Sequence, residues 1–396
     1  MDKVQDAWKL VKIGSLLEKK GTINPKLTPS KEFTYIDITS IDKNQYKIVN
    51  PKKILGKEAP SRARKIVKKN DVIFATTRPN LKNIAIISKE YSNPVASTGF
   101  CVLSPKTNLV DSKFLFNFLL TEGIQEQISP FIRGAQYPAI SDNNLQNCLI
   151  PLPPLPEQKR IVSKLDALFE RIDQSIALLE ENIKHTEALM ASALDEVFSN
   201  IKAKKDFLET CCEKIQYGYT GKTLENGKYY YLRITDIQDG IVDFSKTPFS
   251  DISEKDVNKY RLSKGDILFA RTGATAGKSY LFESNNSSVF ASYLIRVVCN
   301  RDVLKPGFLY WYFQSGDYWK QIFAGVTGAA QPNFNGKKLG NLIIPIPEKI
   351  IQEKVISKVK TVHAAMVKVQ TERKEKLNHL KSLKNSILDK AFKGEL

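Results

Sequence analysis

The sequence of 396 residues has few of the side chains that build metal centres, disulfide frameworks or membrane spans. Its five cysteines are an odd number without any Cys-x-x-Cys spacing, which argues against a disulfide framework and against a zinc ribbon. The three histidines, His185, His363 and His379, fall in stretches that we expect to be helical, so we assign no metal site. No apolar run approaches the roughly 18 residues that a membrane span requires.

A secretory signal is also missing at the start of the chain. Residues 1–6, Met-Asp-Lys-Val-Gln-Asp, do not combine a basic region with a following apolar one. We therefore expect a cytoplasmic protein without a membrane partner.

Complete catalytic motifs are absent as well. The stretch 273–279, Gly-Ala-Thr-Ala-Gly-Lys-Ser, has three residues between its glycines where a phosphate-binding P-loop has four, and a strand is predicted to follow it. The only Pro-Pro pair, at 153–154, is flanked by leucines and lacks the polar and aromatic neighbours with which DNA methyltransferases hold a flipped base. We assign no catalytic residue and expect a protein that is not an enzyme.

Positive charge is abundant, with 60 basic against 42 acidic residues and a net charge of +18. A polyanion is the first partner to consider, because neutralising phosphates releases counterions and supplies much of the affinity for nucleic acid. Residues 151–200 run against this trend with five basic and nine acidic residues, whereas residues 346–396 have twelve and six.

An internal repeat organises the chain. The stretch Pro151–Gln158, Pro-Leu-Pro-Pro-Leu-Pro-Glu-Gln, returns at Pro345–Gln352 as Pro-Ile-Pro-Glu-Lys-Ile-Ile-Gln, 194 residues later. The stretch 69–78, which reads as a polar turn and a buried strand ending in an arginine, returns at 264–273. A shift of nearly half the length indicates two similar halves.

Each proline stretch precedes a long helical pattern. Apolar residues recur at steps of three and four from Ile161 to Val197, and again from Val355 to Ile387 with an interruption at Arg373 and Lys376. This is a coiled-coil pattern with a stutter, and the prolines are expected to begin both helices. An antiparallel pair would bury both apolar stripes and match the acidic helix with the basic one.

The predicted fold class is therefore α+β, with two similar mixed α/β globules, each followed by one long helix of an antiparallel coiled coil. We expect the first globule at 1–150, the first long helix at 151–200, the second globule at 201–344 and the second helix at 345–396. Within the globules, single strands are predicted at 95–103 and 289–298, and short strands at 145–150 and 339–344 before the prolines.

Polar loops at the ends of the predicted central strands are the candidate DNA contacts. Arginine and lysine pair with guanine edges or phosphates, and asparagine and glutamine with adenine. The alternative for each residue is an ordinary solvated loop position. The candidates are Thr77, Arg78, Asn80, Lys82, Arg133, Gln136 and Tyr137 in the first half, and Arg271, Thr272, Thr275, Lys278, Thr327, Gln331, Asn333 and Asn335 in the second.

The stretch 150–162, Ile-Pro-Leu-Pro-Pro-Leu-Pro-Glu-Gln-Lys-Arg-Ile-Val, with its following helix and its weaker copy at 344–352, resembles the specificity subunit of type I restriction-modification systems. The resemblance covers essentially the whole chain. The second copy departs from the pattern at 348–351, where Glu-Lys-Ile-Ile replaces the extra Pro-Leu-Pro.

This resemblance implies two target-recognition domains that read the two halves of a bipartite, asymmetric sequence in double-stranded DNA, with the helix pair fixing their spacing. It also implies two methyltransferase subunits docked on the helices, which bring S-adenosylmethionine as their cofactor, and it leaves room for a translocase-nuclease subunit. The stripe positions expected at the partner interface are Ile161, Leu165, Leu168, Ile172, Val355, Val359, Val362 and Met366.

Two other functions remain open at this point. A coiled-coil scaffold could use its globules to bind proteins, with the positive charge serving only solubility. A self-sufficient modification enzyme would have to methylate DNA as a purified chain, and the missing catalytic motifs argue against it.

Overall fold

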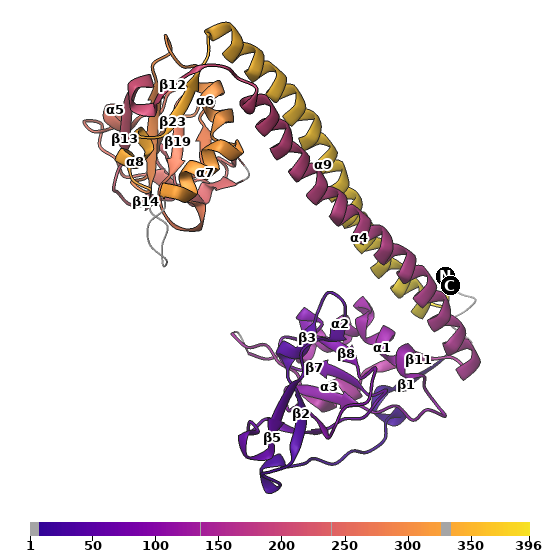
Figure 1. Cartoon of the computed structure of the whole chain (residues 1–396). Helices are drawn as coiled ribbons and strands as arrows, with labels where there is room; N and C mark the ends of the chain where they lie inside the picture. The colour runs from indigo at the N-terminus through magenta and orange to yellow at the C-terminus, as the bar shows by residue number, and fades with distance from the viewer. Residues whose placement is uncertain (1–7, 135, 239, 326–333) are drawn as a thin grey trace. The chain divides into compact units, whose positions relative to one another are not determined.

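The computed structural model describes residues 8–134, 136–238, 240–325 and 334–396. The chain divides into two compact units, Met1–Glu180 with Glu375–Leu396, and Glu181–Lys374. Each unit contains one globule, part of the long helix α4 (Leu155–Ser199) and part of the long helix α9 (Lys349–Phe392) (Figure 1). The predicted fold class, two mixed globules each followed by a long helix, is confirmed.

The first globule is built on two small sheets and three short helices. One sheet has the strand order β10-β7-β8 and the other β5-β2-β9-β6, while β1 pairs with β11. The elements are β1 (Lys9–Lys12), β2 (Glu32–Ile36), β3 (Ile41–Asp42), β4 (Lys47–Ile48), β5 (Lys52–Leu55), β6 (Ala63–Ile66), β7 (Val72–Ala75), β8 (Ile84–Ile86), β9 (Pro94–Ser97), β10 (Phe100–Leu103), α1 (Ser112–Leu120), α2 (Glu122–Ile128), α3 (Asp142–Gln146) and β11 (Leu149–Leu152).

The second globule repeats this plan. Its two main sheets have the orders β13-β22-β19-β20 and β14-β18-β15-β21, and β12 pairs with β23. The elements are β12 (Lys204–Phe207), β13 (Cys212–Tyr217), β14 (Thr223–Leu224), β15 (Tyr230–Leu232), β16 (Ile237–Gln238), β17 (Ile241–Val242), β18 (Phe249–Ser250), α5 (Val257–Tyr260), β19 (Ile267–Ala270), β20 (Ser279–Leu281), β21 (Ser288–Phe290), β22 (Leu294–Cys299), α6 (Pro306–Tyr312), α7 (Gly316–Gly325), α8 (Gly336–Gly340) and β23 (Ile343–Ile346).

Two kinds of strand prediction were wrong. The expected single strand at 95–103 is divided between β9 and β10, which lie in different sheets on either side of a turn at Thr98 and Gly99. The stretch 289–298 is divided in the same way between β21 and β22. The strand predicted from 145 begins instead as α3, because the side chain of Ser141 accepts a hydrogen bond from the backbone of Asn144 and caps a helix.

The proline stretches do more than begin helices. Pro151 lies in β11 and Pro345 in β23, each in a two-stranded ladder, where a residue without an amide hydrogen is tolerated. Pro156 lies in the first turn of α4, as predicted, whereas α9 begins at Lys349 after the last proline. The prolines therefore begin one helix only.

A buried glutamine fixes the start of each long helix to its globule. Gln158 accepts a hydrogen bond from the amide of Asp111 at 2.8 Å and donates to the carbonyls of Leu109 at 3.1 Å and Pro153 at 2.8 Å. Gln352 accepts from Lys305 at 2.8 Å and donates to Val303 and Pro347 at 2.9 and 2.8 Å.

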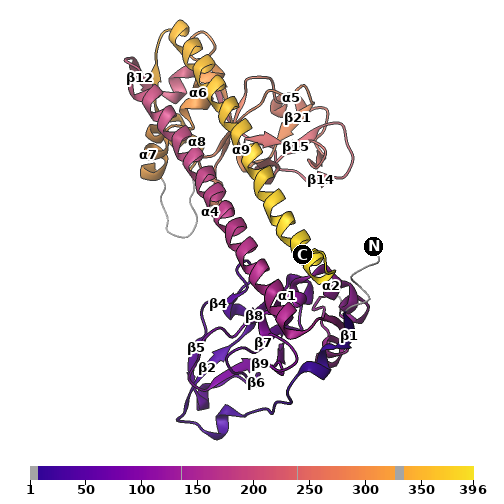
Figure 2. The same ribbon diagram turned by 90° about the vertical axis from the view of Figure 1, so that its right-hand side faces the viewer.

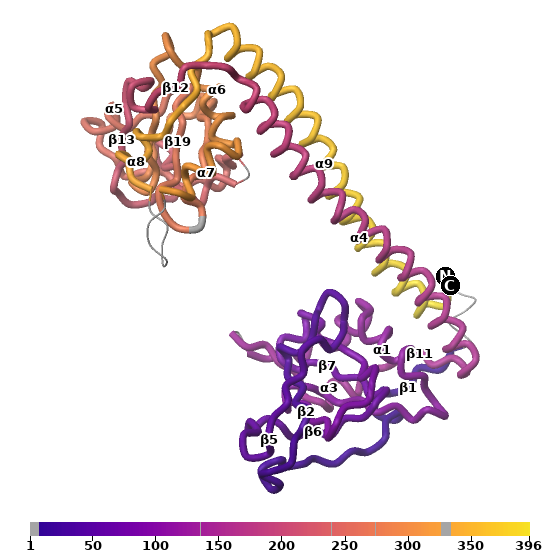
Figure 3. The backbone as a smooth tube through the Cα atoms, in the orientation of Figure 1, coloured from indigo at the N-terminus to yellow at the C-terminus, as the bar shows by residue number. Residues whose placement is uncertain are grey.

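The ends of the long helices carry a second repeat. Leu-Asp-x-x-Phe ends α4 at 194–198 and α9 at 388–392. In the first unit, Phe392 packs on Phe114 of α1, and Asp389 accepts a hydrogen bond from the amide of Glu122 at the start of α2. The backbone trace of Figure 3 follows α9 to its end beside α1.

The equivalent contacts occur in the second unit. Phe198 packs on Phe308 and Tyr312, and Asp195 accepts from the amide of Gly316 at the start of α7. Each globule is therefore packed against the beginning of its own long helix and against the end of the other one.

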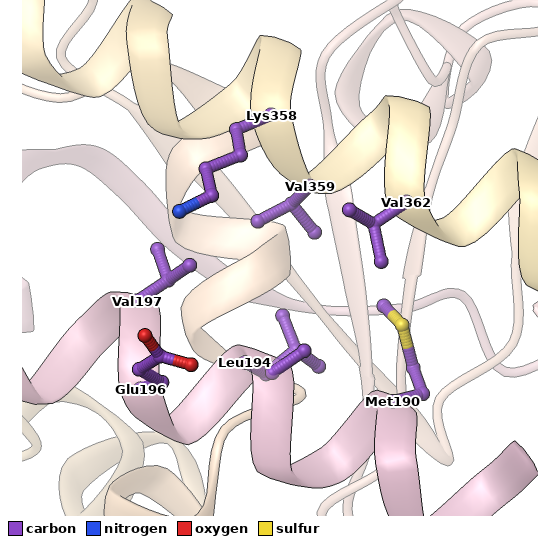
Figure 4. Close-up of a pocket in the computed structure, with 8 residues that line it drawn as sticks. Met190, Leu194, Glu196, Val197, Lys358, Val359 and Val362 are labelled. Carbon is purple, nitrogen blue, oxygen red and sulfur yellow. The ribbon is translucent and has the colours of Figure 1, made fainter.

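The two long helices are antiparallel within each unit (Figures 1 and 2). In the first unit, Lys384 of α9 forms an ion pair with Asp173 of α4 at 2.7 Å. In the second, Met190, Leu194 and Val197 of α4 face Val359 and Val362 of α9 around a small cavity of about 60 Å³ (Figure 4). At the predicted stutter, Arg373 donates to the carbonyl of Asn182 at 2.7 Å and to the hydroxyl of Thr186.

Candidate nucleic-acid interface

The two polar loops of the first globule lie side by side. The amide of Arg78, which follows β7, donates to the carbonyl of Pro138 at 2.6 Å. Arg133 and Ala139 exchange two backbone hydrogen bonds, and Thr77 forms an isolated bridge with Ala139. The structure thus brings together segments 77–82 and 133–139, which the sequence predicted only as separate contact loops.

An arginine and a tyrosine form an exposed part of this loop pair. The guanidinium of Arg78 lies 5.3 Å from the ring centroid of Tyr137, and this tyrosine is 72% exposed. Arg78 has a φ of 49° and Lys82 one of 48°, so two residues with side chains adopt the left-handed conformation around the short turn Pro79–Leu81. The loop is held in one unusual shape that presents a cation on an aromatic face.

Lys82, another of the predicted contacts, has partners within the chain. Its ammonium donates to the carbonyl of Leu120 at 3.0 Å and to the carboxylate of Glu122 at 2.7 Å, so it ties the loop to α1 and α2. Asn80, Arg133 and Gln136 are exposed, and Thr77 is half-buried. One guanidinium nitrogen of Arg133 donates hydrogen bonds to the carbonyls of Pro130 and Ile132.

The second globule presents a similar pair. Arg271, which follows β19, lies 5.0 Å from the ring centroid of Tyr217, and its carbonyl accepts a hydrogen bond from Phe334. The hydroxyl of Tyr217 accepts from the amide of Gly336 at 2.8 Å. Tyr217, Arg271 and the segment 334–336 are therefore in contact with one another.

The other second-half candidates have different roles. Asn335 caps α8 by accepting from the amide of Lys338 at 2.9 Å, so its side chain serves the fold. Thr272 and Thr275 are half-buried around the turn Gly273–Thr275, and Lys278 is exposed. Thr327, Gln331 and Asn333 lie outside the described residues.

Sequence reasoning missed the tyrosines of the second globule. Tyr217 precedes the glycine-containing loop at 218–223, and Tyr293, which is 64% exposed, accepts through its carbonyl from the amide of Arg271. An aromatic residue beside a glycine-containing loop was the available signal in the sequence.

A buried aspartate precedes each of the two strands that lead to these arginines. Asp71 is fully buried before β7 and pairs with Lys20, while Asp266 before β19 pairs with Arg296 at 2.7 Å. Burial raises the pKa of Asp266 above its usual value of 3.8, although Arg296 opposes the shift. The residue before each aspartate, Asn70 or Gly265, has a positive φ, which both residue types accommodate.

The predicted partner contacts on the helices need correction. Five of these residues are buried within this chain, which leaves little of them for another subunit to contact: Ile161, Leu165, Ile172, Val355 and Val359. All except Ile172 belong to the apolar cores of the two units. Leu168, Val362 and Met366 are half-buried. When two helices pair, each covers the apolar stripe of the other, so residues of these stripes become buried within the chain.

Other apolar side chains of the helices are exposed. Leu178 and Leu383 belong to the first unit, and Leu189 and Val367 to the second; the two leucines of α4 are each 60% exposed. In the described ranges, no cluster of metal-binding side chains is found, and no helix has the length and apolar character needed to cross a membrane.

Comparison with known proteins agrees with these features. The family of the type I restriction modification DNA specificity domain matches twice, at residues 5–184 and 199–379. The chain therefore belongs to this family, and it has the two recognition domains of a type I specificity subunit.

Individual relatives and solved structures agree. The EcoKI specificity subunit of Escherichia coli K12 is 27% identical over 75% of this chain and 68% of its own length, and the MjaVIII specificity subunit of Methanocaldococcus jannaschii is 22% identical over 100% and 94%. A chain from a solved type I R-M system is 31% identical with a TM-score of 0.85 over the full length of both chains. The HsdS subunit of Thermoanaerobacter tengcongensis is 32% identical with a TM-score of 0.58 over 98% and 97%.

Proposed function

We propose that this chain recognises a bipartite, asymmetric DNA sequence, one half with each globule, and that the paired helices set the distance between the halves. The observation that carries the proposal is that both globules place an arginine on a tyrosine ring at the end of the central strand, Arg78 on Tyr137 and Arg271 on Tyr217. Such side chains read base edges and stack on bases, and the net charge of +18 favours the phosphate backbone.

In this proposal the chain contributes recognition and no chemistry. Two methyltransferase subunits would supply the methyl-transfer reaction with S-adenosylmethionine, and a translocase-nuclease subunit could join them in the cytoplasm. The apolar residues Leu178, Leu189, Val367 and Leu383 are exposed on the long helices and would be covered by subunits that dock there.

A deletion series tests the spacing role. Removing one heptad from α4 and the opposed heptad from α9 shortens the helix pair by about 10 Å, which corresponds to about three base pairs. Selection of bound sequences from a random duplex pool, with methyltransferase subunits present, should return both half-sites unchanged with a shorter gap. An unchanged gap contradicts the spacing role.

Salt dependence separates recognition from the scaffold alternative. Binding of duplex DNA should weaken steeply between low and moderate salt, because each neutralised phosphate releases counterions. The absence of duplex binding, even with methyltransferase subunits present, would favour a scaffold whose globules bind proteins.

A further inference from the structure

A cavity of about 400 Å³ lies within the second unit, between the globule and α9. This volume falls in the range of roughly 300–1,000 Å³ typical of small-molecule sites. Its lining comes from the segment around β16, the loop before β20, α6, α7 and α9, and it includes Gln238, Lys278, Tyr310, Gln314, Trp319 and His363.

The aromatic side chains of the cavity are held in place by their neighbours. Trp319 packs closely on Gly277, where an added Cβ would lie 2.8 Å from the indole ring, and Gly277 has a φ of 93°. His363 of α9 lies against Trp311, with ring centroids 5.0 Å apart. The cavity therefore offers fixed flat surfaces to a ligand, and such surfaces stack on planar rings.

Two polar side chains of the cavity have hydrogen-bonding capacity that no described residue of the chain uses. The amide nitrogen of Gln314 donates to the hydroxyl of Ser279 at 2.9 Å, which leaves its carbonyl oxygen free of any hydrogen bond within the described part of the chain. Among the residues that the structure describes, the ammonium of Lys278 has no hydrogen-bond or ion-pair partner. A ligand would thus meet an amide edge and an uncompensated cation.

This chemistry narrows the class of ligand. The described lining has a single histidine and no carboxylate or thiol, which is a poor set for a metal ion. A purely apolar ligand would leave the ammonium of Lys278 and the side-chain carbonyl oxygen of Gln314 without a partner in the described part of the chain. Planar rings with hydrogen-bonding edges and an attached anion fit best, and a nucleobase with its phosphate has this character.

We propose that the cavity receives one unstacked nucleobase of the DNA bound by the second globule, with the base against the aromatic side chains and its phosphate at Lys278. The inference rests on the proposed function. The loop from Arg271 to Lys278 supports DNA as the source, because it joins the pair of half-buried Arg271 and exposed Tyr217 to the rim of the cavity. A free nucleotide has the same chemistry, and the test distinguishes the two sources.

A mismatch scan tests the proposal with the full chain and its methyltransferase subunits. Each base pair of the second half-site is replaced in turn by a mismatch that keeps the base on one strand, and equilibrium affinity is measured. One position should bind about tenfold more tightly when mismatched, because the cost of unpairing the base is then already met. Trp319→Leu and Lys278→Gln should abolish this gain and weaken binding of the matched duplex about tenfold.

Lys320→Gln is the matched control. Lys320 lies next to Trp319 on α7 but does not line the cavity, so this substitution removes one positive charge outside the cavity. It should keep the mismatch gain. Because Lys278 is exposed, Lys278→Gln should fold even if Trp319→Leu does not.

A flat mismatch scan on a duplex that binds with normal sequence preference overturns the cavity proposal and leaves the proposed function intact. Saturation by deoxynucleoside monophosphates without DNA, together with a flat scan, assigns the cavity to free nucleotides and also overturns it. Loss of all duplex binding by the unmodified complex would instead contradict the proposed function.

Discussion

Phe392, at the end of α9, packs its ring on Phe114 of the first globule with 4.9 Å between the ring centroids. Phe198, at the end of α4, makes the equivalent contact with Phe308 of the second globule at 5.5 Å. The last turn of each long helix is therefore part of a globule core. Each unit depends on residues that are distant in sequence.

Replacing Phe392 by alanine should destabilise the first unit by about 3–5 kcal/mol, the usual cost of removing a buried phenylalanine ring. Hydrogen exchange with mass spectrometry should show lost protection in α1 and β7. Phe198→Ala is the matched variant and should shift the loss to α6 and β19. Equal loss in both units after either substitution would argue against two separate anchors.

The buried glutamine at the start of each long helix should contribute to the free energy of unfolding of its unit. Gln158→Leu leaves the amide of Asp111 and two carbonyls without their partner, which costs about 1–3 kcal/mol. Denaturant unfolding followed by exchange in the first unit measures the loss. Gln174→Leu, at an exposed position of α4, should stay within about 0.5 kcal/mol of the parent protein and serves as the control.

Periodicity and the internal repeat were sufficient to predict the long helices and their pairing, because a single apolar stripe on a long helix needs a partner. The glutamine roles were not predictable in this way. Gln158 and Gln352 have charged neighbours in the sequence, which suggests exposed positions. They are buried because the chain at Asp111 and at Lys305 folds over them and donates backbone hydrogen bonds to their side chains. The Leu-Asp-x-x-Phe repeat is visible in the sequence, but periodicity alone does not assign its contacts with the globules.

The candidate interface was predictable in residue type more than in geometry. Arginines after buried strands were found by pattern, and the structure places Arg78 and Arg271 at equivalent strand ends. Their tyrosine partners come from different parts of the two halves, Tyr137 after α2 and Tyr217 at the end of β13. Loop contacts of this kind depend on tertiary packing, which local sequence does not fix.

Tyr137 offers a test of the first recognition loop. Tyr137→Ala should weaken binding of a duplex with the correct first half-site about tenfold, because base stacking on an exposed aromatic ring contributes roughly 1–3 kcal/mol. Fluorescence anisotropy at fixed salt measures the effect. Tyr137→Phe keeps the ring beneath Arg78 and should bind nearly as the parent does; an equal loss in both variants would assign the effect to the hydroxyl instead.

The pH dependence of stability provides a test of the second unit. Burial lowers the pKa of His363 from its usual value of 6.5, so the native state takes up this proton less readily than the unfolded state. The resulting loss of unfolding free energy is absent well above pH 6.5 and grows as the pH falls below that value. Urea unfolding of the second unit between about pH 8 and pH 5 should follow this course.

His363→Gln should flatten the acid side of that stability profile, since the half-buried titrating ring is removed. His379→Gln is the matched control, because His379 is an exposed residue of the same helix. The two substitutions should therefore differ in slope below pH 6.5 rather than in stability at pH 8. If both variants keep the full acid-dependent loss, the loss arises from other groups and the burial of His363 does not contribute to it.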